Sequence, residues 1–197
     1  RPVWVSDPSR HGQAIRSTVR ILPSGKGFTV NGIRMGHDQL TLRGEQGLAL
    51  VFAKTNGTPN GGINGVLKPA ADQRLMVPVS GLVHVVRRGD GFLVINQVDL
   101  EEYVKGVVPS EVNSTWHPEM LKAQAVAART YALYQQMLSA ARDYDVVASV
   151  QDQVYRGKQG IDAAVLRAVE ETEHALVAVQ LGQRGQPVGR GHRVLVD

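Results

Sequence analysis

The chain has 197 residues, a net charge of +4 and no cysteine. This length is enough for one domain of ordinary size or two small ones. The lack of cysteine excludes disulfides and thiolate metal sites, and no apolar run approaches the roughly 20 residues that a membrane span needs. The basic charge favours an anionic partner such as a nucleic acid, a phospholipid or an acidic wall polymer.

The first 98 residues predict a framework of short strands joined by turns. Proline, serine and arginine are frequent in residues 1–13, so we expect an irregular arm there. Alternating apolar and polar residues then predict strands over residues 14–22, 28–30, 39–43, 48–54, 76–79, 82–87 and 92–98. Turn residues separate these strands, among them Asn31-Gly32 and the hairpin turn at residues 88–91. Residues 55–65 are rich in glycine and are expected to form a loop.

Two consecutive helices are predicted after this framework. Asp99 can cap the first, with Glu102 placed three residues later as in a capping box. Pro109 disfavours helical backbone at the residue before it, so we expect this helix to end at Val108. A second helix should begin near Pro118 and run to about residue 141. Its expected buried stripe consists of Leu121, Ala125, Ala128 and Ala132.

The remaining sequence predicts shorter elements. Residues 144–155 suggest a strand with a polar interruption, and Asp162 is placed to cap a third helix over residues 163–173. Residues 175–181 suggest another strand, whereas residues 182–197 form a basic, glycine-rich tail. The fold class is therefore α+β, with a β-hairpin-rich N-terminal framework, a helical core and a short C-terminal helix and strand.

Glu111 is the acidic residue in the connection between the two predicted helices. A carboxyl group partly withdrawn from water beside an aromatic ring, here Trp116, can stay protonated and act as a general acid. Cleavage of a glycosidic bond requires such a proton donor. On spacing alone, a solvated surface glutamate is the more frequent alternative.

Other classes of site find little support. The motifs of nucleophile elbows, P-loops, zinc proteases and dinucleotide-binding folds are missing from the sequence. The six histidines lack the spacing of metal ligands, so we expect no metal and no cofactor. Aromatic residues make up 5% of the chain, which argues against a base-stacking surface for nucleic acid.

Residues 94–133 closely resemble the core of the SpoIID/LytB family of bacterial cell-wall proteins. The matching motifs are L-E-E-Y-V-K-G-V-V-P-S-E, a short spacer with tryptophan, and L-K-A-Q-A-V-A-A-R-T-Y-A. Weaker similarity extends from about Val19 to about Gln180. The resemblance implies a SpoIID-like domain over residues 14–181, divided into a β-rich part (14–98) and a helical catalytic part (99–181). Residues 1–13 and 182–197 then lie outside it as an arm and an atypical tail.

The SpoIID branch of this family consists of lytic transglycosylases. They cleave the MurNAc–GlcNAc bond of peptidoglycan, prefer strands stripped of stem peptides and leave a 1,6-anhydro-MurNAc end. The resemblance implies that Glu111 protonates the glycosidic oxygen and then takes the proton of the C6 hydroxyl. The residues implied to hold the glycan or Glu111 are Lys122, Gln124, Arg129, Tyr131, Gln153 and Tyr155. For the residues of the second helix, internal pairing that buttresses the helix is an equal alternative.

The chain departs from the family pattern in two places. Relatives often carry a Cys/His cluster that can hold zinc, but the matching positions here are Val147, Gln151 and Asp152. Relatives also continue into a Ser-Gly-Gly-rich segment, which residues 182–197 do not resemble, so this tail is expected to be naturally short, truncated or altered in reading frame.

The resemblance predicts a secreted or envelope enzyme that acts on peptidoglycan glycan strands, in sporulation or cell-wall remodelling. A first alternative is a LytB-type, non-catalytic enhancer of a cell-wall amidase. A second is a wall-binding module that has lost its activity together with its C-terminal segment.

Overall fold

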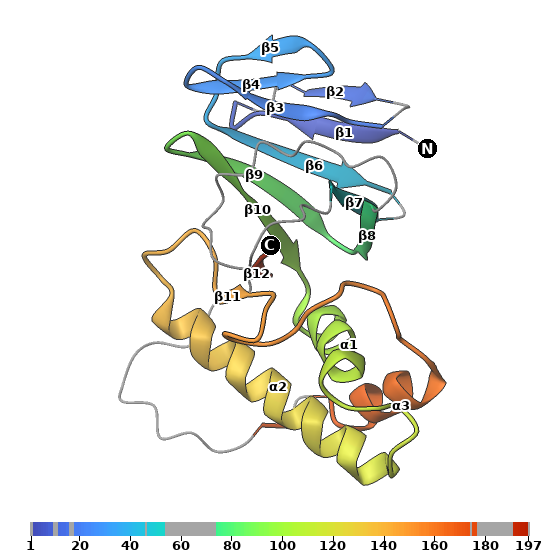
Figure 1. Ribbon diagram of the computed structural model, residues 1–197. Coiled ribbons are helices and arrows are strands. Elements are labelled where there is room, and N and C mark those ends of the chain that lie inside the picture. Colours follow the sequence, from blue (N-terminus) through green and yellow to red (C-terminus); the bar gives the residue numbers. More distant parts are fainter. Residues whose placement is uncertain are drawn as a thin grey trace. The chain divides into compact units, whose positions relative to one another are not determined.

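The computed structural model describes residues 2–9, 12–15, 18–45, 47–53, 74–173, 175–176 and 191–196 (Figure 1). The chain divides into two compact units, Arg1–Ile95 and Asn96–Asp197. This division lies close to the predicted change from a β-rich to a helical part at residue 98. The residues predicted to form the loop 55–65 lie outside the described part.

The first unit consists of antiparallel strands. β2 (Gly12–Ile15), β1 (Val3–Ser6), β6 (Gln39–Gly44) and β9 (Leu82–Arg88) pair in this order. β3 (Ile21–Ser24), β4 (Gly27–Val30) and β5 (Ile33–Met35) form a second sheet, and β7 (Leu48–Ala53) pairs with β8 (Arg74–Val79). The register places Val5 opposite Leu42 and Leu42 opposite Val83, and all three are buried. One face of this sheet therefore forms a core, as the alternating sequence predicts.

The turns follow the predicted chemistry. Asn31 and Gly32 both have positive φ values, 49° and 86°, which the tight turn between β4 and β5 requires. Gly89 lies in the turn between β9 and β10 (Gly91–Val98), also at positive φ, so the predicted hairpin is confirmed.

Two predictions for the first unit are wrong. The expected irregular arm contains β1, which pairs with both β2 and β6 and whose Val5 side chain is buried. The single strand expected over residues 14–22 is replaced by the ends of β2 and β3, because residues 18–20 have no regular structure. Both errors arise because strand formation depends on the partner strand and not only on local alternation.

The second unit contains three helices, α1 (Leu100–Glu111), α2 (Pro118–Leu138) and α3 (Ala163–Glu171), which pack against one another (Figure 1). Asp99 caps α1 by accepting hydrogen bonds from the backbone N–H groups of Glu101 and Glu102. Asp162 caps α3 in the same way. The predicted stripe of α2 is confirmed, since Leu121, Ala125, Ala128 and Ala132 are all buried.

α1 continues through Pro109, three residues beyond its predicted end. Proline lacks an N–H group and therefore loses one hydrogen bond of the last turn. The backbone N–H of Val112 still bonds the carbonyl of Val108 at 3.0 Å, and the Ser110 hydroxyl donates to the carbonyl of Gly106 at 3.2 Å. Glu111 is consequently the last residue of α1, at the edge of the connection to α2.

The C-terminal tail also differs from expectation. His192–Leu195 form β12, which pairs in parallel with β11 (Val146–Val147). Val194 is fully buried, and the next two residues are nearly so. The polar stretch after β11 forms turns, so only two residues of the strand predicted over 144–155 are extended. Most of the strand predicted over 175–181 lies outside the described residues.

Candidate active site around Glu111

Glu111 places an exposed carboxylate at the C-terminal end of α1. Its Oε1 accepts a hydrogen bond from the backbone N–H of Val154 at 2.8 Å. Oε2 makes no hydrogen bond to the part of the chain that the structure describes. Trp116 is itself half exposed, so the water-depleted aromatic surroundings expected from the sequence are not observed. The carboxylate is thus oriented through one oxygen and open to solvent.

Close packing brings the segment that contains Val154 against α1. A Cβ atom at Gly106 would lie 2.4 Å from the carbonyl oxygen of Gly157 and 2.6 Å from the ring of Tyr155. Gly160, at a positive φ of 74°, lies next to the ring of Pro109. Only glycine at position 106 permits this contact, because any side chain there would displace backbone atoms.

Three consecutive residues, 152–154, bind the surrounding elements, and we call them the anchoring segment. Asp152 accepts a hydrogen bond from the hydroxyl of Tyr131 on α2 at 2.5 Å and another from the backbone N–H of Val147 at 2.8 Å. The Oε1 atom of Gln153 accepts a hydrogen bond from the hydroxyl of Tyr103 on α1 at 3.0 Å. Val154 then donates to Glu111. The segment therefore connects α1, α2 and β11 at the site.

Buried aromatic rings adjoin the anchoring segment. The rings of Tyr103 and Tyr155 stack with centroids 5.2 Å apart, and His192 stacks on Tyr103 at 6.0 Å. The hydroxyl of Tyr155 donates to the Oδ1 atom of Asn96 at 2.9 Å. Burial raises the pKa of both tyrosines, and the negative charge of Asp152 raises the pKa of Tyr103 further. Both hydroxyls therefore remain protonated donors at neutral pH.

Tyr131 is less buried than Tyr103 and Tyr155. Its hydroxyl accepts from the side-chain amide of Gln135 at 2.8 Å while it donates to Asp152. Partial burial and the hydrogen bond to Asp152 raise the pKa of Tyr131. This hydroxyl is therefore held in a fixed direction by two partners, which suits a structural role beside the anchoring segment.

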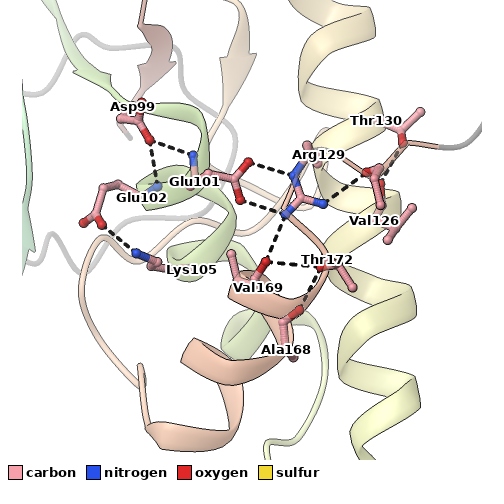
Figure 2. A network of polar contacts seen from close by, with 11 residues as sticks. Asp99, Glu101, Glu102, Lys105, Val126, Arg129, Thr130, Ala168, Val169 and Thr172 are labelled. Carbon is pink, nitrogen blue, oxygen red and sulfur yellow. Dashed lines mark hydrogen bonds and ion pairs between the residues drawn. The ribbon is translucent and has the colours of Figure 1, made fainter.

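Arg129, expected from the sequence to bind substrate or buttress the helix, buttresses it. Its side chain is 1% exposed. The guanidinium donates to both carboxylate oxygens of Glu101, at 2.8 and 2.7 Å, and to the backbone carbonyls of Ala175 and Val169 (Figure 2). The planar guanidinium group of Arg129 therefore connects α1, α2 and the end of α3.

Four further residues were predicted to contact the glycan or Glu111: Lys122, Gln124, Gln153 and Tyr155. Lys122 forms ion pairs with Glu119 at 2.9 Å and with Glu171 at 2.7 Å, and hydrogen bonds to these two carboxylates raise its pKa. Gln124 is half-buried on α2. Gln153 and Tyr155 are buried and bonded internally, which argues against the direct glycan contacts expected for them.

No sequence motif predicts a functional role for Tyr103 or Gln135, and Asp152 is notable in the sequence only as a replaced zinc ligand. One signal was available for Asp152. The polar run at residues 151–153 interrupts an otherwise apolar stretch, and buried polar groups need hydrogen-bond partners.

Within the described residues, no group of histidines and carboxylates is arranged to hold a metal ion. Asp152, which the family resemblance aligns with a possible zinc ligand, accepts hydrogen bonds from Tyr131 and Val147. None of the helices in the described ranges has the length and apolar character of a membrane span.

Comparison with known proteins agrees with the motifs around this site. The family model described as SpoIID, stage II sporulation protein, matches residues 88–178. An uncharacterised protein of Brachyspira hyodysenteriae is 40% identical over 104 residues, which are 52% of this chain and 28% of that protein. The stage II sporulation protein D of Bacillus subtilis is 43% identical over 68 residues, 32% of this chain and 20% of the relative.

A shorter match concerns the stage II sporulation protein D of Bacillus amyloliquefaciens, 57% identical over 37 residues, 19% of this chain and 11% of the relative. The chain thus spans less than a third of the length of each of these curated relatives. No solved structure matches the chain. The part of the chain that carries Glu111 and the anchoring segment, residues 88–178, belongs to the SpoIID family.

Proposed function

We propose that this protein is a lytic transglycosylase that cleaves MurNAc–GlcNAc bonds in peptidoglycan glycan strands outside the cytoplasmic membrane. The observation that carries the proposal is the carboxylate of Glu111, exposed at the end of α1 and oriented through one oxygen by the N–H of Val154. An oriented carboxyl group open to solvent can meet a polymer that is too large to enter a closed pocket.

The reaction needs only one carboxyl group. Protonated Glu111 gives its proton to the glycosidic oxygen while the bond from that oxygen to C1 of MurNAc breaks. The resulting carboxylate takes the proton of the C6 hydroxyl as this oxygen attacks C1 and closes the anhydro ring. The carboxyl group ends in its starting form, and no water is consumed. A second catalytic carboxylate is therefore not required.

The net charge of +4 supports an acidic cell-wall polymer as the partner. The chain does not need a cofactor for this chemistry, because each proton leaves and returns through the same side chain.

The test is incubation of the protein with glycan strands freed of stem peptides, followed by mass spectrometry of the products. We expect anhydro-ended fragments from the wild type and none from Glu111→Gln. Glu170→Gln, which makes the same chemical change at an exposed position on α3, is the matched control and should retain activity.

Two results contradict the proposal. If the wild type releases no anhydro-ended product, the enzyme is not a transglycosylase. If Glu111→Gln is as active as the wild type, another group supplies the proton. An increase in the rate of an added cell-wall amidase, without product from the protein alone, would instead support the enhancer alternative.

A further inference from the structure

The hydrogen bond that orients Glu111 comes from a peptide group whose neighbour is anchored in the protein core. The N–H of Val154 belongs to the peptide that follows Gln153, and the side chain of Gln153 is held by the hydroxyl of Tyr103. A peptide group is planar and rigid. Its N–H direction is therefore set by the backbone of Gln153, which the anchored side chain restrains.

Tyr103 is well suited to act as the fixed end of this connection. Its side chain is fully buried, and Gln153 is 8% exposed, so water cannot compete for their hydrogen bond. The rings of Tyr155 and His192 both stack on the ring of Tyr103 and restrict its movement. The link from Asp152 to Tyr131 is only partly buried, so water can reach it.

The bond to Val154 also distinguishes the two oxygens of Glu111. A backbone N–H must donate to a lone pair, whereas the hydroxyl oxygen of a carboxylic acid is itself a donor and a poorer acceptor. Glu111 therefore keeps the stronger bond to Val154 in the acid form when the proton resides on Oε2. Oε1 then remains the carbonyl-like acceptor in both protonation states.

We propose that Tyr103 is a positioning residue, which through Gln153 and the N–H of Val154 holds Oε1 of Glu111 and leaves Oε2 as the oxygen that carries the transferred proton. The role of Oε2 in catalysis rests on the proposed transglycosylase function. The positioning of the carboxylate by Tyr103 does not, and it can be measured without substrate.

The decisive comparison is Tyr103→Phe against Tyr155→Phe. Each change removes one buried hydroxyl that donates to a side-chain amide oxygen, in Gln153 or in Asn96, and each leaves a ring in the same stack. The two variants should therefore lose thermal stability to a similar degree. Only Tyr103→Phe removes a hydrogen bond to the anchoring segment, the one to Gln153.

The first readout is the amide resonance of Val154 in ¹⁵N-labelled protein. Glu111→Gln identifies the resonance change that accompanies loss of the carboxylate partner. Tyr103→Phe should move the Val154 resonance toward that position. Tyr155→Phe changes the residue next to Val154, so it should shift the resonance by less and not toward the Glu111→Gln position. Gln153→Leu removes the acceptor from the other side and should reproduce the effect of Tyr103→Phe, so the test does not depend on one variant.

The second readout is cleavage of glycan strands. We expect Tyr103→Phe to lower kcat about tenfold, since misplacement of a catalytic group can cost up to about a hundredfold, while KM changes by less than about twofold because no binding contact is lost. A purely structural role would lower kcat equally in Tyr103→Phe and Tyr155→Phe, after correction for the folded fraction.

The two proposals fail in different ways. An unchanged Val154 resonance and an unchanged kcat in Tyr103→Phe would overturn the positioning role, while anhydro products from the wild type would still support the enzyme. A shifted Val154 resonance in a protein that makes no anhydro product would support positioning and overturn the transglycosylase function.

Discussion

Replacement of Arg129 by methionine should strongly destabilise the helical unit. The side chain is 1% exposed and donates two hydrogen bonds to Glu101 and two to backbone carbonyls. Removal of one partner from a buried ion pair typically costs about 3–5 kcal/mol, because the remaining charge and acceptors lose their donor. The side chain of Glu101 is 20% exposed and can regain some hydration, so we expect the lower end, about 3 kcal/mol.

Lys122→Met provides the matched control on the same helix. Lys122 also pairs with two carboxylates, but its side chain is 28% exposed and its partners Glu119 and Glu171 are 68% and 48% exposed. Exposed pairs are screened by water and contribute little to stability. Lys122→Met should therefore leave the free energy of unfolding close to that of the wild type.

Urea unfolding followed by circular dichroism at 222 nm measures this difference in the appropriate unit, because all described helices lie between residues 96 and 197. Arg129→Met should shift the transition to clearly lower urea concentration with an unchanged slope. If it destabilises the unit no more than Lys122→Met does, the buttressing role is wrong and the substrate-binding role expected from the sequence regains support.

Three further predictions follow from single contacts. Gly106→Ala should cost about 1–3 kcal/mol and reduce glycan cleavage, because the added methyl would lie 2.4 Å from the backbone oxygen of Gly157. Gly36→Ala, where nothing lies within 4 Å, should be neutral, and equal effects in the two variants would contradict the close packing. Burial tends to raise the pKa of Asp145, but hydrogen bonds from Arg193 and Ser139 outweigh burial and hold the pKa below the ordinary value of 3.8. The ionised Asp145 therefore stabilises the folded state above pH 3.8, and this stabilisation is lost as the pH falls through the lower pKa of the folded state. Asp145→Asn should thus be less stable than the wild type at pH 7, with a gap that narrows below pH ~4; a gap independent of pH in urea titrations would show that the charge is irrelevant. Asp99→Ala should remove the cap of α1 and cost about 1 kcal/mol by the same unfolding assay, and an unchanged midpoint would show that other groups satisfy the first turn.

The two ends of α1 show which helix boundaries can be predicted from neighbouring residues and which cannot. The start at Asp99 was predictable, because a cap satisfies N–H groups that lie two and three residues away. The end was predicted too early, since the cost of Pro109 is local but the contacts that hold the last turn against residues 153–160 are not. Glu111 is therefore helical, and its carboxylate meets a residue 43 positions later in the chain.

The tail illustrates the same limit. Its composition suggested an appendage to the fold, yet the guanidinium of Arg193 pairs at 2.7 Å with Asp145, which is fully buried, and Val194 lies in the core. Residues 192–195 have a pattern too short to predict a strand by itself. They become one because β11 offers a parallel partner.

Features that depend on residues within a few positions of one another could be predicted before the structure: the hairpin turns, the cap and stripe of the helices, and the motifs that point to Glu111. Which polar groups meet could not be predicted, because it depends on how distant segments pack. Arg129 and Glu101 are 28 residues apart, and Tyr103 and Gln153 are 50 residues apart. Each of these groups has several possible partners in the sequence, and only packing that excludes water makes one hydrogen bond preferable to the others.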